Sequence, residues 1–213
     1  MPSRKSIANE EDWGDQPALF DTSVKIFRYL VVISPSQEMI AEIARLKRKI
    51  LERIGGYRGD RSVAHMTFLF AYLPIEYERD LIEGITMGVQ DRRAIKMEFE
   101  GIHHFPDRSS IFIQPKDEKP LIELRKSIRR SLHSNKQLKR LGIHPTSSAL
   151  IYVARKLSPD QFDRAWSALF PHHFDRTETV NEVILLRSGL KEGDRHQIVG
   201  RFTMNADPAS PIR

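Results

Sequence analysis

The stretch His65-Met-Thr-Phe-Leu-Phe70 lies inside a longer apolar run that is closed by a proline. Aromatic and aliphatic residues bounded in this way predict a β-strand over 63–73. Because side chains alternate across a strand, we expect His65 and Thr67 on one face and Met66 on the other. An imidazole can move a proton near neutral pH, and a hydroxyl beside it can donate to a phosphoryl oxygen. A His-x-Thr pair is common by chance, so its surroundings decide its meaning.

The elements on both sides of this strand follow an order that repeats. Pro74 lies nine positions after His65, and Pro159 lies nine positions after Leu150. Each span covers a strand and the entry to a helix, so the repeat aligns Leu150 with His65. Apolar spacing predicts strands over 26–33, 63–73, 95–102, 110–115, 149–154, 180–186 and 197–204, and helices over 36–54, 75–89 and 119–133, with a further helix starting at Ser158.

Composition bounds the chemistry that the chain can carry. The 213 residues include 34 Lys plus Arg, 28 Asp plus Glu and no Cys, which gives a formal charge of +6. The lack of Cys excludes disulfide frameworks, thiolate zinc sites and thiol nucleophiles, so His, Ser/Thr or carboxylates must act. Two predicted helices each carry a block of basic residues, and such blocks are compatible both with a path for phosphate groups and with a solvated helix face.

The chain organisation predicts one domain with two short flanks. No apolar run approaches 18 residues and no signal peptide is evident, so we expect a cytoplasmic protein that does not contact membranes. Residues 1–23 are predicted to be a partly flexible arm and 205–213 a tail. Between them, 24–204 form one bilobal domain, with lobes of about 24–105 and 106–204.

Set in this duplicated chain, the string His65–Phe70 resembles the first signature of the two-histidine (2H) phosphoesterases, the superfamily of 2′-5′ RNA ligases and cyclic phosphodiesterases. The resemblance covers about 24–204 and extends to the strings Val153-Ala-Arg-Lys-Leu-Ser-Pro-Asp-Gln-Phe162, Val183-Ile-Leu-Leu-Arg187 and Ile198-Val-Gly-Arg-Phe202. It implies an α+β fold with two antiparallel sheets around a central cleft and helices outside. It also implies a phosphoesterase for 2′,3′-cyclic phosphates or 2′-5′ linkages in RNA or small nucleotides, without a metal or other cofactor.

The second half of the chain departs from the family pattern. In that family two His-x-Thr/Ser motifs face each other, one histidine acting as general base and the other as general acid. Here the repeat puts the second motif at Leu150-Ile-Tyr152, which has neither the histidine nor the small hydroxyl residue. Upstream, His144-Pro-Thr146 does have the His-x-Thr form. Three alternatives stay open: a degenerate second motif, His144 and Thr146 brought in by a shifted loop, or an unrelated site.

The candidate residues therefore fall into a catalytic and a substrate-binding group. Tyr152 is expected to stack a base or donate its hydroxyl, whereas regular strand parity places Arg155 on the opposite face and Phe70 in the core. The catalytic candidates are His65, Thr67, His144 and Thr146, and the substrate-binding candidates are Leu150, Tyr152 and Arg155. Two functions remain open: a phosphoesterase weakened by loss of the second histidine, or a non-catalytic nucleotide- or RNA-binding protein. A monomer is favoured.

Overall fold

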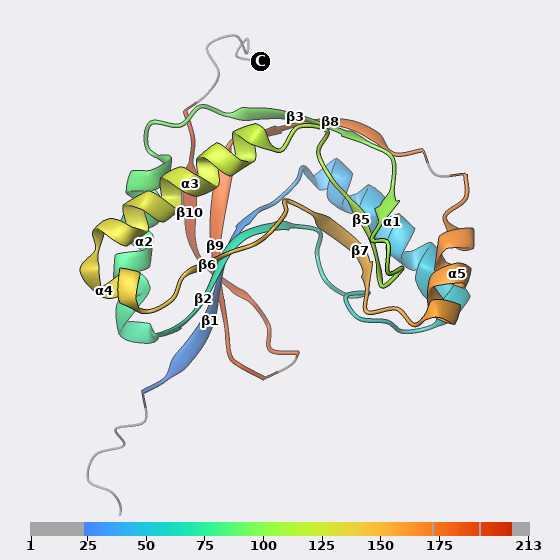
Figure 1. Cartoon of the computed structure of the whole chain (residues 1–213), viewed down its shortest axis with the longest axis horizontal. Helices are drawn as coiled ribbons and strands as arrows, with labels where there is room; N and C mark the ends of the chain where they lie inside the picture. The colour runs from blue at the N-terminus through green and yellow to red at the C-terminus, as the bar shows by residue number, and fades with distance from the viewer. Residues whose placement is uncertain (1–23, 172, 192, 206–213) are drawn as a thin grey trace, which may run out of the picture.

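The computed structural model describes residues 24–171, 173–191 and 193–205, which form an arch of two halves (Figure 1). Eight strands make one antiparallel sheet in the order β10-β9-β1-β2-β7-β5-β4, with β6 paired to β2 off this path. Two more strands, β3 and β8, form a separate ribbon. The strands are β1 (Ile26–Ile33), β2 (Met66–Pro74), β3 (Ile95–Glu100), β4 (His103–His104), β5 (Ser110–Ile113), β6 (His144–Pro145), β7 (Ile151–Arg155), β8 (Asp175–Val180), β9 (Glu182–Ser188) and β10 (Gln197–Thr203).

The helices cover one face of the large sheet in two groups. In one half, α2 packs against α3, and in the other α1 packs against α5. Each helix presents apolar positions at a 3–4 spacing to the sheet, such as Met39, Ile43 and Ile50 of α1, which are fully buried. The helical segments are α1 (Gln37–Ile54), the short 3₁₀ turn η1 (Ile75–Tyr77), α2 (Glu78–Val89), α3 (Lys119–Ser134), α4 (Lys136–Arg140) and α5 (Pro159–Ala168).

Each half of the molecule contains elements from both halves of the sequence. Helix α1 follows β1 in the chain but packs against α5 and β7, and β9 pairs with β1 rather than with β7. Buried side chains from both halves form one continuous hydrophobic core. The division into 24–105 and 106–204 therefore describes the sequence repeat, and these segments are not two separate bodies.

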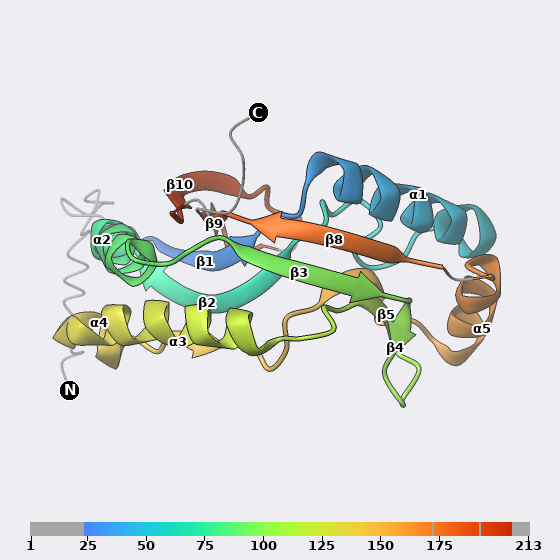
Figure 2. The ribbon, with the colours of Figure 1, turned by 90° about the horizontal axis from the view of Figure 1, so that it is seen from above.

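The ribbon of β3 and β8 runs across the helix side of the molecule from one half to the other (Figure 2). Strand β3 was predicted from its alternating pattern. Strand β8 was not, because its sequence Asp-Arg-Thr-Glu-Thr-Val is polar and buries only Glu178 and Val180. The Glu178 carboxylate accepts hydrogen bonds from the backbone N–H and the hydroxyl of Ser36, which ties β8 to the start of α1.

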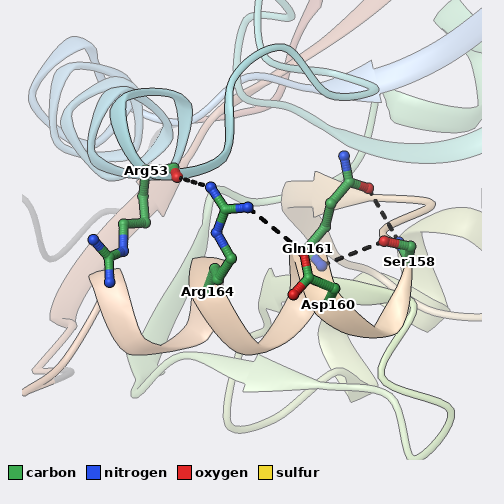
Figure 3. A network of polar contacts seen from close by, with 5 residues as sticks. All are labelled: Arg53, Ser158, Asp160, Gln161 and Arg164. Atoms are coloured by element: carbon green, nitrogen blue, oxygen red, sulfur yellow. Dashed lines mark hydrogen bonds and ion pairs between the residues drawn. The ribbon is translucent and has the colours of Figure 1, made fainter.

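Helix α5 begins with a capping box (Figure 3). The Ser158 hydroxyl accepts from the Gln161 backbone N–H at 3.3 Å, and the Gln161 side chain accepts from the Ser158 N–H at 3.1 Å. Two N–H groups that the helix leaves unpaired are thereby satisfied. Arg164 forms an ion pair with Asp160 and donates to the carbonyl oxygen of Arg53 at 2.6 Å, which joins α5 to the end of α1.

The α+β fold with antiparallel sheets and outer helices confirms the fold class expected from sequence. One difference lies in the sheets, since the strands of the two repeats join into a single sheet where two separate ones were expected. The expected arm 1–23 and the tail beyond residue 205 lie outside the described residues. Within the described part of the chain, no helix has the length and apolar character needed to cross a membrane.

Candidate active site

The two repeats meet where β2 and β7 begin. Met66 and Ile151, the first residues of these strands, lie opposite each other in an antiparallel pair and are both fully buried in the core. His65 and Leu150 each come one residue earlier, so the two positions that the sequence repeat aligns lie symmetrically about this pair. Continued by one residue in each direction, the register sets His65 beside Tyr152 and Thr67 beside Leu150. These four side chains share the face opposite to Met66, which we call the open face.

Each repeat contains a β-bulge two residues after this pair. The pairing of β1 with β2 skips Phe68, and the pairing of β5 with β7 skips Val153. One extra residue reverses the alternation of all side chains that follow. Phe70 and Arg155 consequently turn to the open face. The expectations of Phe70 in the core and Arg155 on the opposite face were wrong for this reason, because both assumed regular strands.

Hydrogen bonds from other segments hold the carbonyl oxygens at both bulges. The Thr146 backbone N–H donates to the Phe68 carbonyl at 2.9 Å, and the Tyr57 hydroxyl donates to the Val153 carbonyl at 3.3 Å. A bulge leaves backbone groups without a ladder partner, so these contacts stabilise it. The same irregularity is thus built into both repeats with different partners.

His65 directly precedes β2, and a hydrogen bond holds its ring in one orientation. Its Nδ1 donates to the Val63 carbonyl oxygen at 2.8 Å, which leaves the Nε2 lone pair free. Burial lowers the pKa of His65, the Val63 hydrogen bond raises it in part, and the nearby positive charges of Lys47 and Arg155 lower it further. His65 is therefore a neutral imidazole at pH 7, ready to accept a proton.

Lys47 of α1 fixes the segment that leads to His65. Its ammonium donates to the carbonyl oxygens of Gly59 and Ser62 and to the Ser62 hydroxyl, at 2.7–2.8 Å. Burial lowers the pKa of Lys47 to about 8, so most of it stays charged at pH 7. The loop also lines a pocket of about 290 Å³ against α1, on the side of the loop that faces Lys47.

Thr67, Tyr152 and Arg155 share the open face with His65. The Thr67 hydroxyl has no hydrogen-bond partner among the described residues and is partly exposed. The Arg155 guanidinium lies over the Tyr152 ring, 4.6 Å from the ring centroid. The Phe105 ring also lies near Tyr152, with 6.5 Å between the two ring centroids. Leu150, at the position equivalent to His65, is 7% exposed. The open face thus joins a proton acceptor, a hydroxyl, an aromatic ring and a cation.

His144 and Thr146 occupy a different place from Leu150. They lie on and just after β6, which pairs with β2 beyond the bulge, so that His144 is opposite Phe70 and stacks on its ring at 5.2 Å. The Thr146 hydroxyl donates to the Thr67 carbonyl at 2.7 Å. His144 is thus set beside a residue five positions along β2 from His65, and the Thr146 hydroxyl is engaged with the backbone of β2.

Two further polar residues of the open face were missed from sequence. Arg28 of β1 donates through Nε to the Ser188 hydroxyl and through Nη2 to Nε2 of His196, both at 3.2 Å. Arg28 faces the same way as Val32, which lies opposite Thr67. Neither Arg28 nor His196 belongs to a local sequence pattern. The two residues meet because β1 pairs with β9, which joins segments about 160 residues apart. Within 24–205, apart from 172 and 192, no three His, Asp or Glu side chains cluster as metal ligands.

Comparisons with known proteins agree with this fold. The model of the 2′-5′ RNA ligase superfamily matches residues 34–192. No curated protein sequence matches significantly. The crystal structure of TT0787 of Thermus thermophilus is similar, with a TM-score of 0.64, 19% identity and coverage of 84% of this chain and 99% of that chain. That of E. coli LigT complexed with 3′-AMP has a TM-score of 0.62 and 17% identity, with the same coverage.

The two strand repeats, joined in one sheet with a His-x-Thr pair in the first, have the fold of the two-histidine phosphoesterases. Within it, the chain belongs to the 2′-5′ RNA ligase superfamily.

Proposed function

We propose that this protein is a phosphoesterase that opens nucleoside 2′,3′-cyclic phosphates or cleaves 2′-5′ linkages, with His65 moving a proton and Thr67 binding a phosphate oxygen. One observation carries the proposal: the free Nε2 of His65 and the unpartnered Thr67 hydroxyl, among the described residues, lie on the same face, close to the cation Arg155. The charges that shift the pKa of His65 are all positive. An anion is the ligand that such a face favours.

The reaction that fits this arrangement is attack by water on phosphorus. His65 takes one proton from the water through Nε2 as the new O–P bond forms. The P–O bond to one ribose oxygen breaks, and that oxygen takes up a proton to become a hydroxyl. The Thr67 hydroxyl donates to a non-bridging oxygen, whose negative charge grows in the transition state. The proposed step uses no metal ion, so chelation is expected to leave the rate unchanged.

The substrate class follows from the groups around His65. E. coli LigT forms crystalline complexes with 3′-AMP, NADP⁺, ATP and phosphate, which share phosphate and mostly carry adenosine. In the present chain we assign the phosphate to Thr67 and Arg155 and a base to the Tyr152 ring. Aromatic stacking binds any base, so we expect RNA ends and small nucleotides as ligands.

A second function, nucleotide binding without turnover, is favoured by Leu150. This residue stands where the repeat would place a second histidine, and leucine cannot transfer a proton. If no other group replaces it, loss of one acid or base step lowers the rate by about 10²–10⁴-fold. The change Leu150→His with Tyr152→Thr would then raise turnover, because it restores both an imidazole and a small hydroxyl.

Hydrolysis of adenosine 2′,3′-cyclic phosphate tests the proposal. We expect the wild type to release adenosine monophosphate and His65→Ala to lose the activity by about 10²-fold or more while still folding. His133→Ala on α3 is the control, because this histidine lies away from the open face. Binding of 3′-AMP without any hydrolysis would favour the second function, and equal rates in the wild type and His65→Ala would refute the first.

A further inference from the structure

A row of mostly apolar side chains crosses the open face beside the candidate active site. Phe70 of β2 lies opposite Leu30 of β1 on one side and opposite His144 of β6 on the other. Leu30 in turn lies opposite Leu186 of β9, and Leu186 lies opposite Ile198 of β10. Residues that are directly opposite in an antiparallel sheet share a face, so the whole row follows Phe70 to the open face. None of these side chains is fully buried, and Ile198 is 51% exposed.

A second row, next to the first, combines an exposed ring with a cation. Arg28 lies opposite both Tyr72 of β2 and Ser188 of β9. The Tyr72 ring is 53% exposed and meets the Phe70 ring edge-on, with 6.4 Å between the ring centroids. The Arg28 guanidinium donates to the Ser188 hydroxyl and to Nε2 of His196, which are neutral acceptors. No carboxylate among the described residues pairs with Arg28, so its charge stays available to an anion.

The bulge at Phe68 sets both rows in line with Thr67. The partners of Thr67, Phe70 and Tyr72 on β1 follow each other at intervals of two residues. Two residues of a strand span about 7 Å, so these three side chains stand in even steps of about 7 Å along the open face. Without the inserted residue, Phe70 and Tyr72 would point into the core. A ligand bound at Thr67 can therefore continue along β2 past both rings.

Tyr152 and Arg155 extend from Thr67 in the opposite direction. Strand β7 is antiparallel to β2 and pairs with it through the first residue of each strand. It therefore runs away from the end of β2 that carries Phe70 and Tyr72. The open face thus offers an aromatic ring and a cation on both sides of Thr67. Such an arrangement suits a ligand with two bases and two phosphates better than a single nucleotide.

We propose that Tyr72 and Arg28 form a second nucleotide subsite, so that the protein binds single-stranded RNA ends in preference to mononucleotides. The base next to the reacting phosphate stacks on the Tyr72 ring beside Phe70, and Arg28 binds a second phosphate. The RNA must be single-stranded here, because paired bases stack on each other and leave no face for a protein ring. This inference rests on the proposed function, since it takes the reacting phosphate to lie at Thr67.

The test compares the binding of 3′-AMP with that of the trinucleotide ApApAp, which ends in the same 3′-phosphate. We expect the wild type to bind ApApAp about 10-fold tighter or more. Tyr72→Leu should weaken ApApAp binding by about 5–100-fold and leave the Kd for 3′-AMP unchanged. Tyr72→Phe is the matched control, because it keeps the ring and should keep the tight binding. Tyr72 is exposed, so both variants should keep the wild-type melting temperature.

Arg28→Gln tests the second phosphate contact in the same titrations. We expect weaker binding of ApApAp and a smaller dependence of its Kd on salt, because one phosphate contact is removed. Binding of 3′-AMP should stay at the wild-type level. Lys49→Gln, which removes an exposed cation of α1, is the charge control and should behave like the wild type.

Each outcome decides for or against the subsite. Equal Kd values of the wild type for ApApAp and 3′-AMP would overturn this inference, whereas hydrolysis of adenosine 2′,3′-cyclic phosphate would still uphold the proposed function. Tight ApApAp binding that survives both Tyr72→Leu and Arg28→Gln would also overturn it, since the longer chain then binds elsewhere. A change of molar mass in Tyr72→Leu, with unchanged ApApAp binding, would assign the rows to a contact between two copies. The expected Kd pattern in a wild type without turnover would uphold the subsite and refute the catalytic function alone.

Discussion

Met66 lies opposite Ile151, and this antiparallel pair joins β2 to β7. The bulges at Phe68 and Val153 follow it at the same distance on each side. Such symmetry indicates that an internal duplication shaped the backbone of the site. The side chains next to the pair are not symmetric, because His65 and Thr67 correspond to Leu150 and Tyr152. The backbone of the two repeats is therefore symmetric at the candidate site, whereas the side chains are not.

The protonation of His65 predicts the acid limb of the pH profile. Burial and nearby cations lower the pKa of His65 below its ordinary value of 6.5, so its base form persists as the pH falls through that value. We expect kcat/KM for the cyclic phosphate to fall only below about pH 6.5. This parameter reports the ionisation of groups in the free enzyme, and His65 is the group assigned here as base. An acid inflection above that pH would contradict the assignment of His65 as base.

Replacing Lys47 tests the support of the His65 loop. Lys47→Met leaves two carbonyl oxygens and one hydroxyl without their donor, and we expect a loss of roughly 1–3 kcal/mol in the free energy of unfolding. The pKa of His65 should rise, because a nearby cation is removed. Urea unfolding and histidine NMR titration measure both effects. Lys49→Met, at an exposed position of the same helix, should change neither.

Arg155 is predicted to bind phosphate from the open face. Arg155→Leu should weaken binding of 3′-AMP by about 5–20-fold, as expected for an exposed charged contact, with less effect at high salt. Calorimetric titration at two salt concentrations measures this change. The neighbouring exposed Lys156 provides the control Lys156→Leu. If both variants bind like the wild type, Arg155 has no part in phosphate binding.

The close approach of α2 and α3 predicts a large effect of one methyl group. A Cβ at Gly88 would lie 2.6 Å from the Cα of Ile128, and this backbone atom cannot move aside alone. Gly88→Ala should therefore destabilise the fold by about 1–3 kcal/mol, despite the better helix propensity of alanine. Met87→Ala, one residue earlier and exposed, should change stability by less than about 0.5 kcal/mol. A Gly88→Ala protein as stable as the wild type would contradict the tight packing.

Local patterns were sufficient for most elements and for two residues of the candidate site. The Ser36 and Ser158 caps and the 3–4 apolar spacing predicted the helices, and the His-x-Thr string marked His65 and Thr67. Strand β8 escaped because a polar ribbon carries no apolar alternation. The orientations of Phe70 and Arg155 were wrong because a single inserted residue in each strand leaves no trace in composition.

The remaining part of the site depends on contacts between distant segments. His196 and Arg28 meet only because β9 pairs with β1, and neither residue belongs to a motif. The choice between Leu150 and His144 as the counterpart of His65 also needed the strand register. Spacing to the following proline pointed to Leu150, the position that the strand register sets symmetrically to His65 about the Met66–Ile151 pair.

Titration of 3′-AMP into the protein, followed by NMR of ¹⁵N-labelled histidine side chains, tests the central claim most directly. The account predicts that the ring signal of His65 shifts in a saturable way with a single Kd, and that the pKa of this ring rises because the bound phosphate is anionic. The His133 signal serves as an internal control and should not move. Shifts confined to other histidines, with His65 unchanged at saturation, would contradict the placement of the phosphate site on the open face.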